Sequence, residues 1–160
     1  MALRRTAAVA LCALLAACGG GTGPPEPVPA QPYQDPGFVR GGGFEMRYGV
    51  MQASSVDAHV ASRHGIRRSK DRAVITVAVS RQAAGSAAVP VEATISGIRR
   101  TLAGGLDALD FRAASADGTV SYIAETDIPD HEPLSLEIEA RPAGSAVRLA
   151  ARITRRFDEG

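Results

Sequence analysis

Apolar residues recur at every second position in five segments after residue 43, and this period of two constrains the fold more than any other feature. In residues 134–140, Leu134, Leu136, Ile138 and Ala140 alternate with serine, glutamate and glutamate. Because successive side chains of a strand point to opposite faces, each segment predicts a strand with one buried and one wet face. The other four segments are residues 44–50, 73–79, 89–95 and 147–153.

Turn signals separate these segments. Asp117-Gly118 supplies the positive φ of a tight hairpin between residues 109–112 and 120–128, and Pro-Ala-Gly-Ser at 142–145 links two other segments. About seven strands with frequent turns are typical of an all-β antiparallel sandwich. Residues 54–64 break the pattern and predict a short helix, capped by Ser54 or Ser55, with Val56 and Val60 on one face, and closed by Gly65.

The first 17 residues have the pattern of an export signal. Arg4 and Arg5 precede a short uncharged apolar run, and Leu-Ala-Ala stands directly before Cys18. This is the pattern of a bacterial lipoprotein, in which acyl chains on Cys18 anchor the mature protein in a membrane. An ordinary cleaved signal with an incidental cysteine is the alternative. Gly19 lacks the acidic character of an inner-membrane retention signal, so we expect the outer membrane, facing the periplasm.

Residues 18–43 predict a spacer between the lipidated cysteine and the domain. Residues 19–43 hold six of the ten prolines and eight of the seventeen glycines, a composition that buries little apolar surface. A proline-rich ligand for a recognition domain is the alternative. Residues 44–160 are then left as one domain, long enough for a single core.

Charge and cysteine content exclude some classes of function. The chain has 18 Lys+Arg and 17 Asp+Glu, so loss of Arg4 and Arg5 leaves 16 against 17 and gives no electrostatic basis for binding nucleic acid. Cys12 leaves with the signal and Cys18 is acylated, so we expect a domain without disulfides.

Residues that could carry out chemistry are sparse. His59 and His64 are five apart, which does not place them on one helical face, and His131 falls in a polar turn. There is no Gly-x-Ser-x-Gly and no phosphate-binding glycine loop. We therefore predict no metal, no cofactor and no enzymatic activity, with a hydrolase of unrecognised site as the alternative.

A basic cluster at residues 63–72 is the candidate binding site. Arg67, Arg68, Lys70 and Arg72 could hold an anion such as a lipid A phosphate or a peptidoglycan carboxylate, because guanidinium groups bind such anions through two donors. A solvated loop with arginines paired to nearby acids is the alternative reading. A second group is interpreted as an ordinary wet strand face: Arg148, Arg152, Arg155 and Arg156.

The chain also resembles a known family. The resemblance spans nearly all of residues 44–157 and is most distinctive at 65–72, Gly-Ile-Arg-Arg-Ser-Lys-Asp-Arg; other matching stretches are residues 44–48, 56–61, 91–97, 122–125 and 141–142. It is similar to bacterial exported proteins of the domain of unknown function 4426, which implies an immunoglobulin-like β-sandwich and brings no catalytic residues. Gly49 in place of an expected Asn, and Ala58-His59 in place of Pro-Glu, depart from the family pattern.

Signal, linker and sandwich together predict a lipid-anchored periplasmic binding or assembly module. Its partner would be an envelope protein or an anionic glycan.

Overall fold

The computed structural model describes residues 37–82, 85, 87–116 and 118–157. The predicted signal at 1–17, Cys18 and the linker up to residue 36 lie outside the described residues, so the lipid anchor stays a prediction. All described residues belong to one compact unit, residues 34–160.

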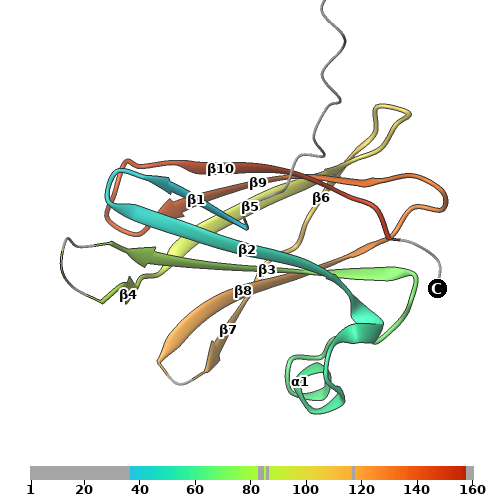
Figure 1. Ribbon diagram of the computed structural model, residues 1–160, viewed down its shortest axis with the longest axis horizontal. Coiled ribbons are helices and arrows are strands. Elements are labelled where there is room, and N and C mark those ends of the chain that lie inside the picture. Colours follow the sequence, from blue (N-terminus) through green and yellow to red (C-terminus); the bar gives the residue numbers. More distant parts are fainter. Residues whose placement is uncertain (1–36, 83–84, 86, 117, 158–160) are drawn as a thin grey trace, which may run out of the picture. The chain divides into compact units, whose positions relative to one another are not determined.

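Two antiparallel sheets form the domain (Figure 1). The first contains, in order, β1 (Phe38–Gly41), β2 (Phe44–Gln52), β3 (Arg72–Arg81), β8 (Thr119–Asp127) and β7 (Arg112–Ala116), with β4 (Val89–Pro90) also paired to β3. The second contains β10 (Leu149–Arg155), β9 (Leu134–Pro142), β5 (Ala93–Arg100) and β6 (Leu106–Ala108). The all-β sandwich predicted from the alternation is confirmed.

The main core lies between the inner faces of the two sheets. Met46 and Ile75 of the first sheet are fully buried, and Leu136 and Ile138 of the second are at most 2% exposed. These are the positions that the period of two assigned to the inside. Together the inner residues of β2, β3, β9 and β10 supply most of the apolar area that stabilises the fold.

The segment at 89–95, expected as one strand, is divided between the sheets. Val89 and Pro90 pair with β3, and the Val91 amide still donates to the Val79 carbonyl, at 2.9 Å. The chain then crosses to the second sheet, and the Glu92 carbonyl accepts from the amide of Ala143, the residue after β9, at 2.8 Å. Apolar residues alternate in the same way in a strand of either sheet, so the local sequence did not indicate that the chain crosses between the sheets here. Further short strands bring the number of strands within the described residues to ten, against about seven expected.

The expected helix is present with a different cap. A 3-10 turn, η1 (Ala53–Ser55), precedes α1 (Ala58–Arg63). The Asp57 carboxylate accepts from the amides of His59 and Val60, at 2.9 and 3.1 Å. The prediction of Ser54 or Ser55 as the cap was therefore wrong, because the 3-10 turn occupies both serines. Gly65 follows with φ 64°, as expected for the residue that ends a helix.

The segment around α1 covers one end of the outer face of the first sheet. Ala53, Val56, Ala61 and Ile66 pack on Val74 and Ile123, forming a second, smaller apolar core. Val74 was expected on the wet face, but it is 1% exposed because this segment lies over it. Val60, expected to share a face with Val56, points into solvent and is 42% exposed.

The folded domain begins before residue 44. β1 pairs with β2 from Phe38↔Arg47 to Gly41↔Phe44, within the range assigned to the linker. Gly42 and Gly43 have φ of 55° and 79° and form the turn between these strands. Gly42 and Gly43, which were counted with the spacer, are therefore turn residues of a β-hairpin.

Candidate functional site

The predicted basic site lies in the loop that leads from α1 into β3. Arg68 Nη2 donates to the Ser54 carbonyl at 2.8 Å. Arg72 Nη1 pairs with Asp127 at 2.9 Å. Lys70 is exposed, and its carbonyl accepts from Gln52 at 2.7 Å. Arg68 and Arg72 thus contact different parts of the fold rather than converging on one point.

Glu125 of β8 organises the other end of this loop. Its carboxylate, 11% exposed, lies 3.7 Å from Arg72 Nε and accepts from Arg112 Nη2 at 3.0 Å. The amide of Arg67 donates to the same carboxylate at 3.3 Å, and Arg112 also donates to the His64 carbonyl at 2.9 Å. The distinctive arginine motif therefore ties the loop to the first sheet. Its role in anion binding stays a prediction.

A second charged group lies on the outer face of the second sheet. Four guanidinium groups surround two carboxylates of β9, and we call these six residues the arginine face: Arg100, Arg141, Arg148, Arg152, Glu137 and Glu139. Arg148 directly precedes β10, and the other three arginines lie on β5, β9 and β10.

Each carboxylate of the arginine face contacts two arginines. Glu137 lies 3.1 Å from Arg100 and 3.5 Å from Arg152. Glu139 lies 2.8 Å from Arg141 and 3.1 Å from Nε of Arg148. The hydrogen bond from Arg148, followed by that from Arg141, lowers the pKa of Glu139, and the same contact raises the pKa of Arg148. Glu139 therefore stays ionised at neutral pH.

The cations of the arginine face reach further into solvent than the acids. The four arginine side chains are 48–87% exposed, against 34% for Glu137 and 22% for Glu139. Four guanidinium groups against two carboxylates also leave two net positive charges on this face. A ligand approaching the sheet would meet guanidinium groups first.

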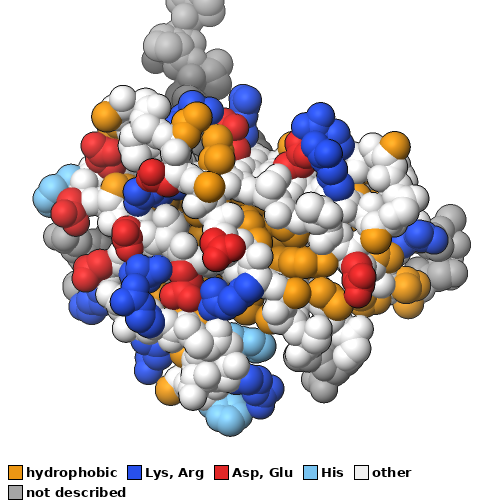
Figure 2. Space-filling view, turned by 180° about the vertical axis from the view of Figure 1, so that it is seen from behind, with side chains coloured by type: hydrophobic (Ala, Val, Ile, Leu, Met, Phe, Trp, Pro, Cys, Tyr) orange, Lys and Arg blue, Asp and Glu red, His pale blue; other side chains and the backbone are white. Residues whose placement is uncertain are grey.

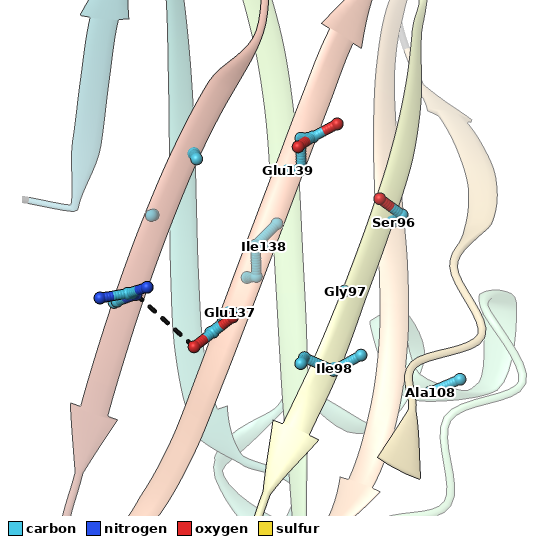
Figure 3. A pocket seen from close by; sticks show the side chains of 10 residues that line it. Ser96, Gly97, Ile98, Ala108, Glu137, Ile138 and Glu139 are labelled. Atoms are coloured by element: carbon cyan, nitrogen blue, oxygen red, sulfur yellow. Dashed lines mark ion pairs between the residues drawn. The ribbon is translucent and has the colours of Figure 1, made fainter. Parts of the chain in front are cut away.

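Beside Glu137, Glu139 and Arg152 the sheet surface is hollowed into an open trough of about 480 Å³. Figure 3 shows Glu137 and Glu139 of β9 beside Ser96 and Ile98 of β5, with Ala108 of β6 at the margin. Serine and alanine side chains keep the floor low, while the longer charged side chains form its walls. The volume is within the range of about 300–1,000 Å³ usual for small-ligand sites.

The sequence reading missed the arginine face. Arg148 and Arg152 were interpreted as an ordinary wet face, because their acidic partners Glu139 and Glu137 stand nine and fifteen residues earlier in the chain. The β9–β10 register places Arg152 directly opposite Glu137. One sequence signal could have predicted the arginine face. Glu137 and Glu139 alternate with apolar residues before the turn at 142–145, and arginines alternate with apolar residues after it.

A buried carboxylate lies on β2, next to the edge strand β1 of the first sheet. Glu45 is 1% exposed and pairs with Arg40 at 2.5 Å and Arg47 at 2.6 Å. The hydrogen bond from Arg40 lowers the pKa of Glu45 against the opposing effect of burial. Both guanidinium groups also lie over the Phe38 ring, at 4.7 and 5.9 Å. The sequence alternation correctly placed Glu45 on the face away from the core. It did not predict that Arg40 and Arg47 would cover the carboxylate on that face.

His59 makes a local contact on α1. His59 Nε2 lies 3.0 Å from Arg63 Nη2 on α1, and His131 has φ 59° in the β8–β9 connection. Within the described ranges, no three His, Cys, Asp or Glu residues are grouped so that they could hold a metal. Among the described residues, no helix is long and apolar enough to cross a membrane.

The fold and the arginine face together define a small antiparallel β-sandwich with an ion-paired outer sheet face. The chain belongs to the DUF4426 family, a domain of unknown function, whose model matches residues 39–158. A solved structure of a DUF4426 family protein from Pseudomonas aeruginosa PAO1 is similar, with a TM-score of 0.61 and 28% identity over 76% of this chain and 95% of that chain. The family resemblance read from the sequence is confirmed. Among curated proteins, the comparison finds no match.

Proposed function

We propose that the protein is a lipid-anchored, periplasm-facing binding module of the outer membrane that holds an anionic ligand on the arginine face. The ligand chemistry is that of several carboxylates or phosphates in a row. In the cell envelope, peptidoglycan and lipid A carry such groups. Cys18, through its lipoprotein pattern, supplies the anchor.

The observation that carries the proposal is that the arginines of the arginine face outnumber the glutamates and are more exposed to solvent. Each carboxylate engages two guanidinium groups, and a guanidinium has five donors, so donors remain for an anion in solution. Guanidinium groups hold carboxylate and phosphate through paired hydrogen bonds. The surplus of two cations is concentrated on one sheet face of a protein whose mature chain is otherwise nearly balanced.

The test uses the chain from residue 18 onward with Cys18→Ser, so that no acyl chain contributes. The described apolar cores lie within residues 38–157 and are retained. Binding to peptidoglycan sacculi and to vesicles containing lipid A is measured separately at low and high salt. Binding should weaken as salt rises, because the Debye length falls from about 10 Å at 0.1 M to about 3 Å at 1 M.

Two matched double variants locate the site. Arg141→Gln with Arg152→Gln removes two cations from the arginine face, and Arg67→Gln with Lys70→Gln removes two from the predicted loop site. The first should abolish most of the binding and the second should leave it nearly unchanged. If instead the loop variant loses binding and the arginine-face variant keeps it, the anion site is in the loop. If both variants bind fully, neither surface recognises the anion. Exposed ion pairs contribute about 0–1 kcal/mol each, so the folding of both variants serves as a control.

A further inference from the structure

A second trough, of about 420 Å³, lies on the outer face of the first sheet, on the opposite side of the sandwich from the arginine face. Its floor and walls come from β2, β3 and β8, which run side by side in Figure 1, and include Arg47, Gly49, Thr76, Ala78 and Ser121. The volume is within the range of about 300–1,000 Å³ usual for small-ligand sites.

The strand register explains why the sheet is hollow here. Arg47 lies opposite Ala78, which in turn lies opposite Ser121. Two residues further along β2, on the same face, Gly49 lies opposite Thr76. Glycine and alanine between the polar side chains keep the floor low. The hydroxyls of Thr76 and Ser121 contact no other group that the structure describes, so both are available to a ligand.

A buried carboxylate fixes the arginine at the end of the trough. Arg47 Nε lies 2.6 Å from Glu45, which is 1% exposed, and the guanidinium lies 5.9 Å from the Phe38 ring. Because the ion pair uses Nε, the two terminal nitrogens of Arg47 keep their donors for a ligand. Glu45 is shared with Arg40, so two guanidinium groups against one carboxylate leave one net positive charge beside the trough.

The lining favours a small anion that carries hydroxyl groups. Among the residues that the structure describes, no Asp or Glu lines the trough, whereas Lys and Arg are interspersed with Asp and Glu on the face shown in Figure 2. A guanidinium binds a carboxylate through two parallel hydrogen bonds, and protein hydroxyls both donate and accept. Since β3 lies between β2 and β8, Arg47 and Ser121 are about 10 Å apart at about 4.8 Å per strand. A ligand that contacts both is therefore short.

From this geometry we infer that the trough binds a small hydroxylated carboxylate of the class of a single sugar acid. Its carboxylate pairs with Arg47, and its hydroxyls bond to Thr76 and Ser121. One net positive charge matches a carboxylate better than a phosphate, which carries about −1.5 to −2 at neutral pH. The inference goes beyond the proposed function and depends neither on Cys18 nor on anion binding by the arginine face.

The test is an NMR titration of the chain from residue 18 with Cys18→Ser. The ligands are glucuronate, galacturonate and N-acetylmuramate, with glucose, galactose and N-acetylglucosamine as their uncharged counterparts. The acids should shift the amide signals of β2, β3 and β8 around the trough, and the uncharged sugars should bind about tenfold more weakly or worse. No shift with any of the acids, or equal affinity for acids and uncharged sugars, would overturn the inference. Tighter binding of glucose 6-phosphate than of every acid would overturn the preference for a carboxylate.

Variants locate the site. Arg47→Gln should weaken binding of the acids about tenfold or more, the factor expected from losing a charged hydrogen bond. Ala78→Leu should weaken it similarly by filling the floor, without touching the contacts of Glu45. Arg40→Gln is the matched control, because it removes the other partner of Glu45 but does not line the trough, so the folded variant should bind normally.

Two results would contradict this location. Full binding by both Arg47→Gln and Ala78→Leu would overturn the site, and so would an equal loss in Arg40→Gln and Arg47→Gln. Binding that is lost only in Arg141→Gln with Arg152→Gln would assign the sugar acid to the arginine face instead.

Discussion

Arg40→Gln is expected to destabilise the domain far more than an exposed ion pair normally would, because it removes a partner from the buried carboxylate of Glu45. Glu45 is 1% exposed, whereas Arg40 is 61% exposed. A hydrogen bond from a charged donor contributes about 1.5–3 kcal/mol. Its stacking on Phe38, at 4.7 Å, adds about 0.5–1 kcal/mol. With Arg47 still present at 2.6 Å, the loss at pH 7 should be about 2–3 kcal/mol.

The loss should depend on pH. The contact with Arg40 lowers the pKa of Glu45 below its ordinary value of 4.5. A lowered pKa in the folded state means that the ionised carboxylate stabilises the fold above about pH 4.5, and that this contribution is lost as the pH falls through the lowered pKa. The difference between the wild type and Arg40→Gln should therefore narrow below pH 4.5.

Urea denaturation followed by circular dichroism at pH 7 and below pH 4.5 measures both effects. Arg100→Gln is the control, since its partner Glu137 is 34% exposed and should lose only about 0–1 kcal/mol. Glu45→Gln should cost less than Arg40→Gln, because the two released guanidinium groups are hydrated at the surface. An equal loss at both pH values, or a larger cost for Glu45→Gln, would refute the reasoning.

Three further predictions follow from the fold and the sequence. Ile138→Ala should cost about 2–4 kcal/mol by opening a cavity in the main core, while Glu137→Ala beside it should cost less than about 1 kcal/mol; equal losses in denaturation would contradict the assigned inner face. Asp57→Ala should cost about 1 kcal/mol by uncapping α1, and a change within error would show that the helix does not need this cap. Cys18→Ser should release the protein from the outer-membrane fraction after a high-salt wash, and its retention there would point to another attachment.

Local periodicity predicted most of the sandwich. At residues 44–50, 73–79 and 134–140 the alternation identified the inner faces, because the side-chain period of a strand is set by its own backbone. The turn at 116–119 was equally local: Ala116 pairs with Thr119, and Gly118 has φ 75°. The family motif at 65–72 identified the fold class. The pairing of its arginines with nearby acids, which the sequence offered as the alternative to an anion site, is present at Arg72, and anion binding by the loop stays a prediction.

What the sequence alone determined is therefore the strands, their faces and the class of fold, since each rests on neighbours within a few residues. The tertiary structure decided which strands share a sheet, where the chain crosses between sheets, and why Val74 and Glu45 are buried on an outer face. It also decided the arginine face, where the β9–β10 register brings Arg152 opposite Glu137. These outcomes depend on contacts between residues far apart in the chain, and the alternating pattern of a single strand does not encode which strand will lie beside it.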